Sequence, residues 1–124
     1  MQDRGWWLGA VLSGALVVIA GAFGAHALEG QLAPRLAAAF EAGVRYQAWH
    51  TLALLAVLAW RASHPLAGQR LAMALWAAGM ALFAGSLYAM ALSGAAGLGM
   101  ITPVGGVLMI GGWLALAGAI LRAR

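Results

Sequence analysis

A long apolar stretch near the start of the chain, residues 6–27, reads WWLGAVLSGALVVIAGAFGAHA and contains no Asp, Glu, Lys or Arg. At a rise of about 1.5 Å per residue, a helix of these 22 residues is about 33 Å long, enough to cross a hydrocarbon core of about 30 Å. Its Ala25-His26-Ala27 end resembles a signal-peptidase site, but the stretch is longer than a signal-peptide core. We therefore interpret it as a retained membrane span.

Three more apolar segments follow it, at residues 43–60, 71–92 and 102–121. The second has Arg45 near its start, and the other two contain no charged residue. All are rich in Ala, Leu, Met and Gly and lack the strict alternation that membrane strands require. The sequence thus predicts an all-α, integral membrane four-helix bundle that forms a single domain over residues 1–124.

The overall composition also indicates a protein bathed in lipid. Of the 124 residues, 65% are hydrophobic and 8% are charged, whereas a soluble domain is about half apolar and about a quarter charged. The net charge of +4 comes from seven Arg that are spread along the chain without a basic run, so no nucleic-acid partner is expected. The absence of Cys excludes disulfides, thiolate catalysis and thiolate metal sites.

The distribution of Arg predicts the orientation in the membrane. One set of termini and connections holds most of them: Arg4, Arg61, Arg70, Arg122 and Arg124. The opposite side has Arg35 and Arg45, which are offset by Glu29 and Glu41. Because short cytoplasmic loops of membrane proteins are rich in basic residues, we predict a multi-pass membrane protein with both termini in the cytoplasm.

The connection between the first two spans, residues 28–42, has an apolar residue at every fourth position: Leu32, Leu36 and Phe40. Pro34 lies near its start, where a helix tolerates proline. This pattern predicts a short amphipathic helix on the membrane surface. The alternative is that the segment simply leads into the second span.

Small residues recur along three of the predicted spans, in patterns that favour close helix packing in lipid. The third span has them at every fourth position (Ala77, Ala81, Gly85, Ala89), as does the fourth (Gly111, Ala115, Ala119), and the first contains Gly14, Gly21 and Ala25. We expect these stripes to pack the bundle itself. The alternative is a docking face for another subunit or a second copy of the chain.

Polar side chains gather where the predicted spans approach the outer side of the membrane: His26, Glu29, Glu41, Arg45, Tyr46, Gln47, His50, Ser86, Tyr88 and Thr102. Glu41 and Arg45 are four residues apart, the spacing of a helical ion pair. One interpretation is that the cluster holds the helices together through interhelical hydrogen bonds. The other is a binding site for an anion, a small molecule or a proton, because ionisable groups inside a membrane often have such roles.

Catalytic and metal chemistry have little support in the sequence. His26 and Glu29 have helical spacing for two metal ligands and His50 could add a third, but without Cys or a second His on the same face the pattern is unspecific, so no metal is predicted. There is no nucleophile elbow, no H-E-x-x-H motif and no pair of carboxylates inside a span. We therefore predict no catalytic residue, no cofactor and no enzymatic activity.

Four blocks of sequence resemble the domain-of-unknown-function family 423 of small bacterial membrane proteins, which has animal relatives called transmembrane protein 256. These blocks are GAFGAHALE (21–29), YQAWHTLALL (46–55), GSLYAMALSG (85–94) and ITPVGGVLMIGGWLAL (101–116). The resemblance implies a four-helix, multi-pass protein of the bacterial inner membrane and no established activity. The positions that match the family's polar pattern are His26, Tyr46, Gln47, His50, Ser86, Tyr88, Thr102 and Pro103.

The expected function follows from these features. We predict a non-enzymatic structural or accessory membrane component that packs with lipids, with a partner subunit or with copies of itself. The alternative is a transporter-like protein that handles a small molecule, an anion or a proton through the polar cluster.

Overall fold

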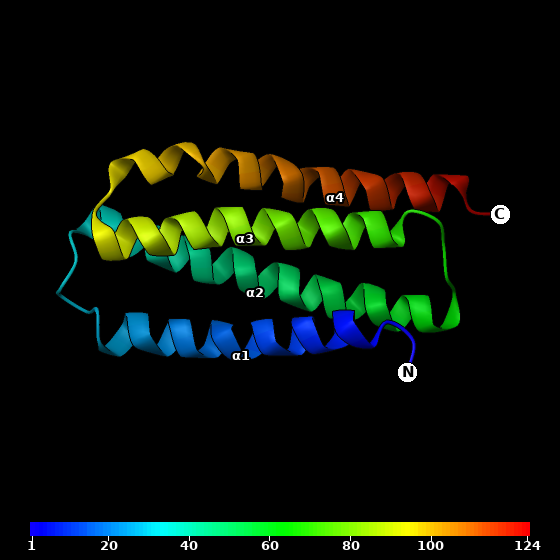
Figure 1. Ribbon diagram of the computed structural model, residues 1–124, viewed down its shortest axis with the longest axis horizontal. Coiled ribbons are helices and arrows are strands. Elements are labelled where there is room, and N and C mark those ends of the chain that lie inside the picture. The colour runs from blue at the N-terminus through cyan, green and yellow to red at the C-terminus, as the bar shows by residue number, and fades with distance from the viewer.

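The computed structural model describes residues 1–124 and contains four long α-helices, one short 3-10 helix and no strand (Figure 1). The elements are α1 (Arg4–His26), α2 (Pro34–Ser63), α3 (Gln69–Ser93), η1 (Ala96–Met100) and α4 (Thr102–Arg122). Successive long helices run in opposite directions, so both ends of the chain lie at the same end of the bundle (Figure 1). We call this the terminal end. The prediction of an all-α four-helix bundle is confirmed.

The helices form an open array rather than a closed ring. The backbone of α1 contacts α2, α2 contacts α3, and α3 contacts α4, with η1 packed against α3 and α4. The backbones of α1 and α4 do not touch. The two central helices, α2 and α3, therefore have neighbours on both sides, whereas α1 has one neighbour.

Three helical segments are long and apolar enough to cross a membrane: α1, α3 and the Ala96–Arg122 segment that includes α4. Helix α2 is not among them, although it is the longest at 30 residues. It carries Arg45, Gln47 and His50, and its position between α1 and α3 places polar groups where neighbouring helices offer partners. Polar side chains of membrane helices generally face the protein interior for this reason.

The segment between α1 and α2 corrects one prediction. No separate amphipathic helix lies between the first two spans, because α2 starts at Pro34 and continues without a break to Ser63. The helical nature of residues 34–42 is as expected, but they are the first turns of α2. The Ala-rich sequence after Pro34 favours helix, and nothing stops it at Gly43. Phe40 in these first turns is buried and packs against Tyr88 of α3.

Helices α3 and α4 pack through small residues spaced seven apart. On α4 these are Gly105, Gly112 and Ala119, and on α3 they are Ala72, Gly79 and Ser86, all buried. A Cβ on Gly105 would lie 2.4 Å from the Phe83 backbone nitrogen, and one on Gly79 would lie 2.8 Å from the Gly105 carbonyl oxygen. The two backbones therefore meet with no side chain between them, as in many membrane helix pairs.

The stripe at every fourth position of α3 does not form this interface, so the prediction that it packs the bundle is wrong. Ala81, Gly85 and Ala89 are exposed, and a Cβ on Gly85 would have no atom within 4 Å. The other two stripes do pack the bundle. Gly14 and Gly21 of α1 face Thr51 and Val44 of α2, and the α4 stripe contacts α3 and the turn before it. The reason is geometric: α3 carries two small-residue faces, and α4 covers the heptad-spaced one.

Candidate functional site

A hydrogen-bonded network centred on Gln47 joins α1, α2 and α3. The Tyr88 hydroxyl donates to Gln47 Oε1 at 2.7 Å, while Gln47 Nε2 lies 3.1 Å from Ser13 Oγ and 3.3 Å from the Ser13 carbonyl oxygen. Ser13 Oγ is also 2.7 Å from Thr51 Oγ1. Both ends of the Gln47 amide therefore have partners on other helices.

Gly43 positions Tyr88 in this network. A Cβ at Gly43 would lie 2.7 Å from Tyr88 Cε1, so the tyrosine ring packs directly against the bare backbone of α2. The ring also packs against Phe40, with 5.0 Å between ring centroids. One helical turn beyond Gly43 the side chain of Gln47 meets the phenol oxygen. The face of α2 that carries Gly43 and Gln47 thus contacts α3.

His50 belongs to a second, aromatic group between α2 and α4. Its Nδ1 is 2.8 Å from the Tyr46 carbonyl oxygen, and Trp113 Nε1–H donates to its Nε2 at 3.1 Å. A carbonyl only accepts and an indole N–H only donates, so the neutral ring with its hydrogen on Nδ1 satisfies both contacts. A second proton on Nε2 would oppose the Trp113 donor. The arrangement makes His50 a link between α2 and α4.

Trp76 completes the aromatic group. Its ring lies 4.5 Å from that of Trp113 and 6.0 Å from that of His50, measured between centroids. Trp76 is almost fully buried, and its Nε1–H has no hydrogen-bond acceptor. Tyr46, one turn before His50, packs on Phe83 and Trp49 and is partly exposed. This group is closely packed by rings.

The remaining predicted residues are separate from these two groups. Ser86 Oγ lies 2.6 Å from Thr102 Oγ1 and donates to the Phe83 carbonyl, which ties α3 to the start of α4. Arg45 and Glu41 form the predicted ion pair at 3.1 Å, on an exposed surface. His26 and Glu29 are exposed at the end of α1 and after it.

The ten predicted positions are therefore not one pocket. Gln47 with Tyr88, His50 with Tyr46, Ser86 with Thr102, and Glu41 with Arg45 are four separate groups, and each contains a hydrogen bond between protein atoms. Glu29 and Glu41 line a cavity of about 590 Å³ between the end of α1 and the start of α2, without His26 or Arg45. Binding of an ion or small molecule by any of these residues stays a prediction.

An ion cluster at the terminal end was not predicted. The Asp3 carboxylate accepts hydrogen bonds from Arg61 Nε at 2.9 Å and from Arg70 Nη2 at 3.0 Å. One acid therefore joins the start of α1 to the end of α2 and the start of α3. The side chains of Asp3 and Arg61 are 5% and 8% exposed, whereas that of Arg70 is 66% exposed. The hydrogen bonds from Arg61 and then Arg70 lower the pKa of Asp3 below its usual value.

Gln69 lies beside this cluster and shapes the connection between α2 and α3. Its side chain is fully buried. Gln69 Oε1 accepts from the Leu66 N–H at 2.8 Å, and its Nε2 donates to the His64 carbonyl at 3.3 Å. The turn therefore has a fixed shape, which sets the position of Arg70 at the next residue.

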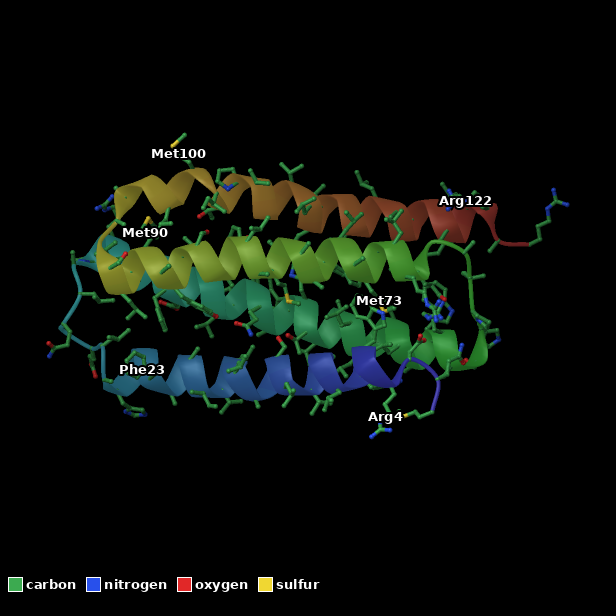
Figure 2. All side chains as sticks on the ribbon, viewed as in Figure 1. Arg4, Phe23, Met73, Met90, Met100 and Arg122 are labelled. Carbon is green, nitrogen blue, oxygen red and sulfur yellow. The ribbon has the colours of Figure 1, made fainter.

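An open apolar groove runs between α1 and α3, and we call it the α1/α3 groove. Two adjoining cavities of about 490 and 420 Å³ form it and share Ser13, Ala77 and Met80. Small residues lie on both of its walls, Gly5, Gly9 and Ser13 from α1 and Ala77, Ala81 and Gly85 from α3. Larger side chains, among them Leu16, Phe23 and Met80, line it between them. Phe23, which also lines the groove, lies near the end of α1 opposite the terminal end (Figure 2). The exposed stripe of α3 lines this groove.

Several of these structural residues could have been noticed in the sequence. Asp3 is the only acid near the Arg-rich termini and connections, Ser13 and Thr51 are polar residues inside apolar spans, and Trp113 lies far from a membrane interface. Each is unusual for its place in a membrane protein. What the sequence could not reveal is the partner, since Asp3 is 58 and 67 residues away from its two arginines.

Comparison with known proteins gives one family. Residues 20–106 match the model of the protein family of unknown function DUF423. The chain is 42% identical to a UPF0382 membrane protein of Haemophilus influenzae, over 91% of this chain and 90% of that protein. It is 41% identical to one of Staphylococcus epidermidis, over 90% of each, and 39% identical to the UPF0382 inner membrane protein YgdD of Escherichia coli, over 100% of this chain and 95% of that protein. No solved structure matches.

Proposed function

Because the chain belongs to the DUF423 family of membrane proteins, whose function is unknown, we propose that it is a non-catalytic structural or accessory component of the bacterial inner membrane. In this proposal it acts by packing with lipid or with another membrane chain. The inner-membrane location rests on the name of the Escherichia coli relative and on the three membrane-length helical segments.

The proposed topology has four spans and both termini in the cytoplasm. Its support is the placement of Arg, since Arg4, Arg61, Arg70, Arg122 and Arg124 all belong to the terminal end of the bundle. The opposite end has a balance of Arg35 and Arg45 with Glu29 and Glu41. A basic end on the cytoplasmic side agrees with the distribution of Arg in other multi-pass proteins.

The observation that carries the proposal is the contrast between satisfied polar groups and unpartnered small residues. The predicted polar side chains form hydrogen bonds to residues of neighbouring helices, as seen for Gln47, His50, Ser86 and Tyr88. The glycines of the α1/α3 groove have no such neighbour, since a Cβ on Gly5, Gly9 or Gly85 would have no atom within 4 Å. Close approach of helices or lipids to such bare backbone is how membrane proteins associate.

Gentle extraction tests this function. The protein, solubilised in a mild detergent, should retain lipid or another chain in native mass spectrometry. Ala81→Leu fills the groove and should reduce the retained species, whereas Ala117→Leu, at an exposed position of α4 outside the groove, should not. A bare monomer in every mild detergent tried would refute the proposal.

A further inference from the structure

The α1/α3 groove ends at a positive charge. Arg70 lies seven residues before Ala77, so the two share one face of α3, and Ala81 follows on the same face. Arg70 bonds to Asp3, the residue that precedes α1. The ion pair therefore bridges the two helices that form the groove walls, next to the groove-lining Gly5 and Trp6.

The cluster at this end has an unused binding capacity. Asp3 carries one negative charge and is shared by two arginines, Arg61 and Arg70, so the three groups together have a net charge of +1. Arg61 and Asp3 are buried, but the Arg70 side chain is 66% exposed and uses a single N–H on Asp3. A guanidinium has five N–H donors in a planar fork that matches a phosphate.

We propose that the α1/α3 groove binds an anionic phospholipid, with the phosphate at Arg70 and an acyl chain along Ala77 and Ala81. This inference rests on the proposed function and names the partner of the same surface. Eleven residues separate Arg70 from Ala81, which is about 16 Å along a helix. That matches one leaflet, about half of a hydrocarbon core of about 30 Å.

Charge complementarity favours a lipid over a protein helix in this groove. An anionic headgroup at the membrane surface reaches Arg70 at the depth where the acyl chain enters the groove, and basic pockets between membrane helices bind such headgroups. A partner helix would need an acidic group at the same depth. One lipid molecule supplies both an apolar chain for the groove and a negative charge for the net charge of +1 at its end.

The experiment measures binding of phosphatidylglycerol and phosphatidylcholine to the delipidated, detergent-solubilised full chain by native mass spectrometry, with thermal stability as a second readout. We expect phosphatidylglycerol to bind more tightly. One basic side chain near the surface contributes about fivefold to anionic-lipid affinity, so Arg70→Gln should weaken phosphatidylglycerol binding about fivefold. Arg70→Lys should keep most of it, and Arg124→Gln, at the exposed terminus, should keep all of it.

A second variant, Ala81→Leu, tests the groove itself. Its side chain would occupy the position of the acyl chain and should weaken the binding of both lipids, and Ala117→Leu is its control. Equal binding of the two lipids, or equal effects of Arg70→Gln and Arg124→Gln, would overturn the inference. Retention of a second chain that Ala81→Leu releases, with no lipid bound, would also overturn it but would leave the proposed function standing. Retention of nothing would overturn both.

Discussion

Gly105→Ala tests whether the backbones of α3 and α4 touch. The added Cβ would lie 2.4 Å from the Phe83 nitrogen, 2.7 Å from the Gly79 carbonyl oxygen and 2.9 Å from the Phe83 Cα. All three atoms are backbone, so no side chain can rotate away. Favourable contact between non-bonded atoms starts near 3.5 Å, so the helices must separate by about 1 Å.

The expected cost can be bounded. Forcing one extra methyl into a well-packed site costs about 1–3 kcal/mol. Against this, Ala is the better helix former by about 1 kcal/mol. The net destabilisation is therefore about 0–2 kcal/mol, which is about 1–3 kcal/mol relative to a glycine-to-alanine change at an open helical site. Separation at Gly105 should also loosen the Gly79 and Gly112 contacts on the same interface.

The measurement is the free energy of unfolding in mixed micelles, followed by circular dichroism. Two glycines provide matched controls. A Cβ at Gly85 would have no atom within 4 Å, and one at Gly111 would lie 3.7 Å from Leu75 Cδ1, an ordinary contact. Gly85→Ala and Gly111→Ala should be neutral or stabilising by up to about 1 kcal/mol. If Gly105→Ala is as stable as these two, the close α3–α4 packing described here is wrong.

Three further predictions address the polar contacts. Arg61 and Arg70 lower the pKa of Asp3, so the Asp3 carboxylate stabilises the fold above its unfolded pKa of about 4, and this stabilisation is lost as the pH falls through the lower folded pKa. Asp3→Asn should therefore remove this acid-dependent part of the curve of stability against pH. An unchanged curve would count against the ion cluster. In a double-mutant cycle of Gln47→Leu and Tyr88→Phe, the coupling energy should be about 0.6 kcal/mol and at most about 2 kcal/mol, and zero coupling would mean that the 2.7 Å hydrogen bond does not contribute. Nitrogen-15 chemical shifts of neutral His50 should show its hydrogen on Nδ1, and Trp113→Phe should weaken this preference; an Nε2–H tautomer in the parent protein would contradict the Trp113 contact.

Much of the fold was predictable because lipid imposes a simple rule on length and polarity. Each apolar segment found in the sequence coincides with a helix, and Arg placement correctly grouped the residues that meet at the terminal end. The Glu41–Arg45 pair followed from helical spacing alone. These features depend on local periodicity and on charge, both of which a single sequence displays.

It was harder to predict which face of each helix contacts the neighbouring helix. Helix α3 carries one set of small residues at Ala77, Ala81 and Gly85 and another that includes Ala72 and Gly79, and nothing in their chemistry says which meets α4. In water the more apolar face of a helix would turn toward the protein interior. In a bilayer the interior and the lipid are equally apolar, so burial does not favour either face. The choice depends on a partner that also presents Gly105 and Gly112, which only the three-dimensional arrangement shows.

The same reasoning explains why the least apolar helix is at the centre. Alone in lipid, α2 would expose the amide of Gln47 and the imidazole of His50, each at a cost of several kcal/mol without a hydrogen bond. Ser13 on α1, Tyr88 on α3 and Trp113 on α4 remove that cost from three directions. The polar residues of α2 thereby specify the order of the helices, and because their hydrogen bonds are satisfied within the protein, they leave the α1/α3 groove as the surface available for association.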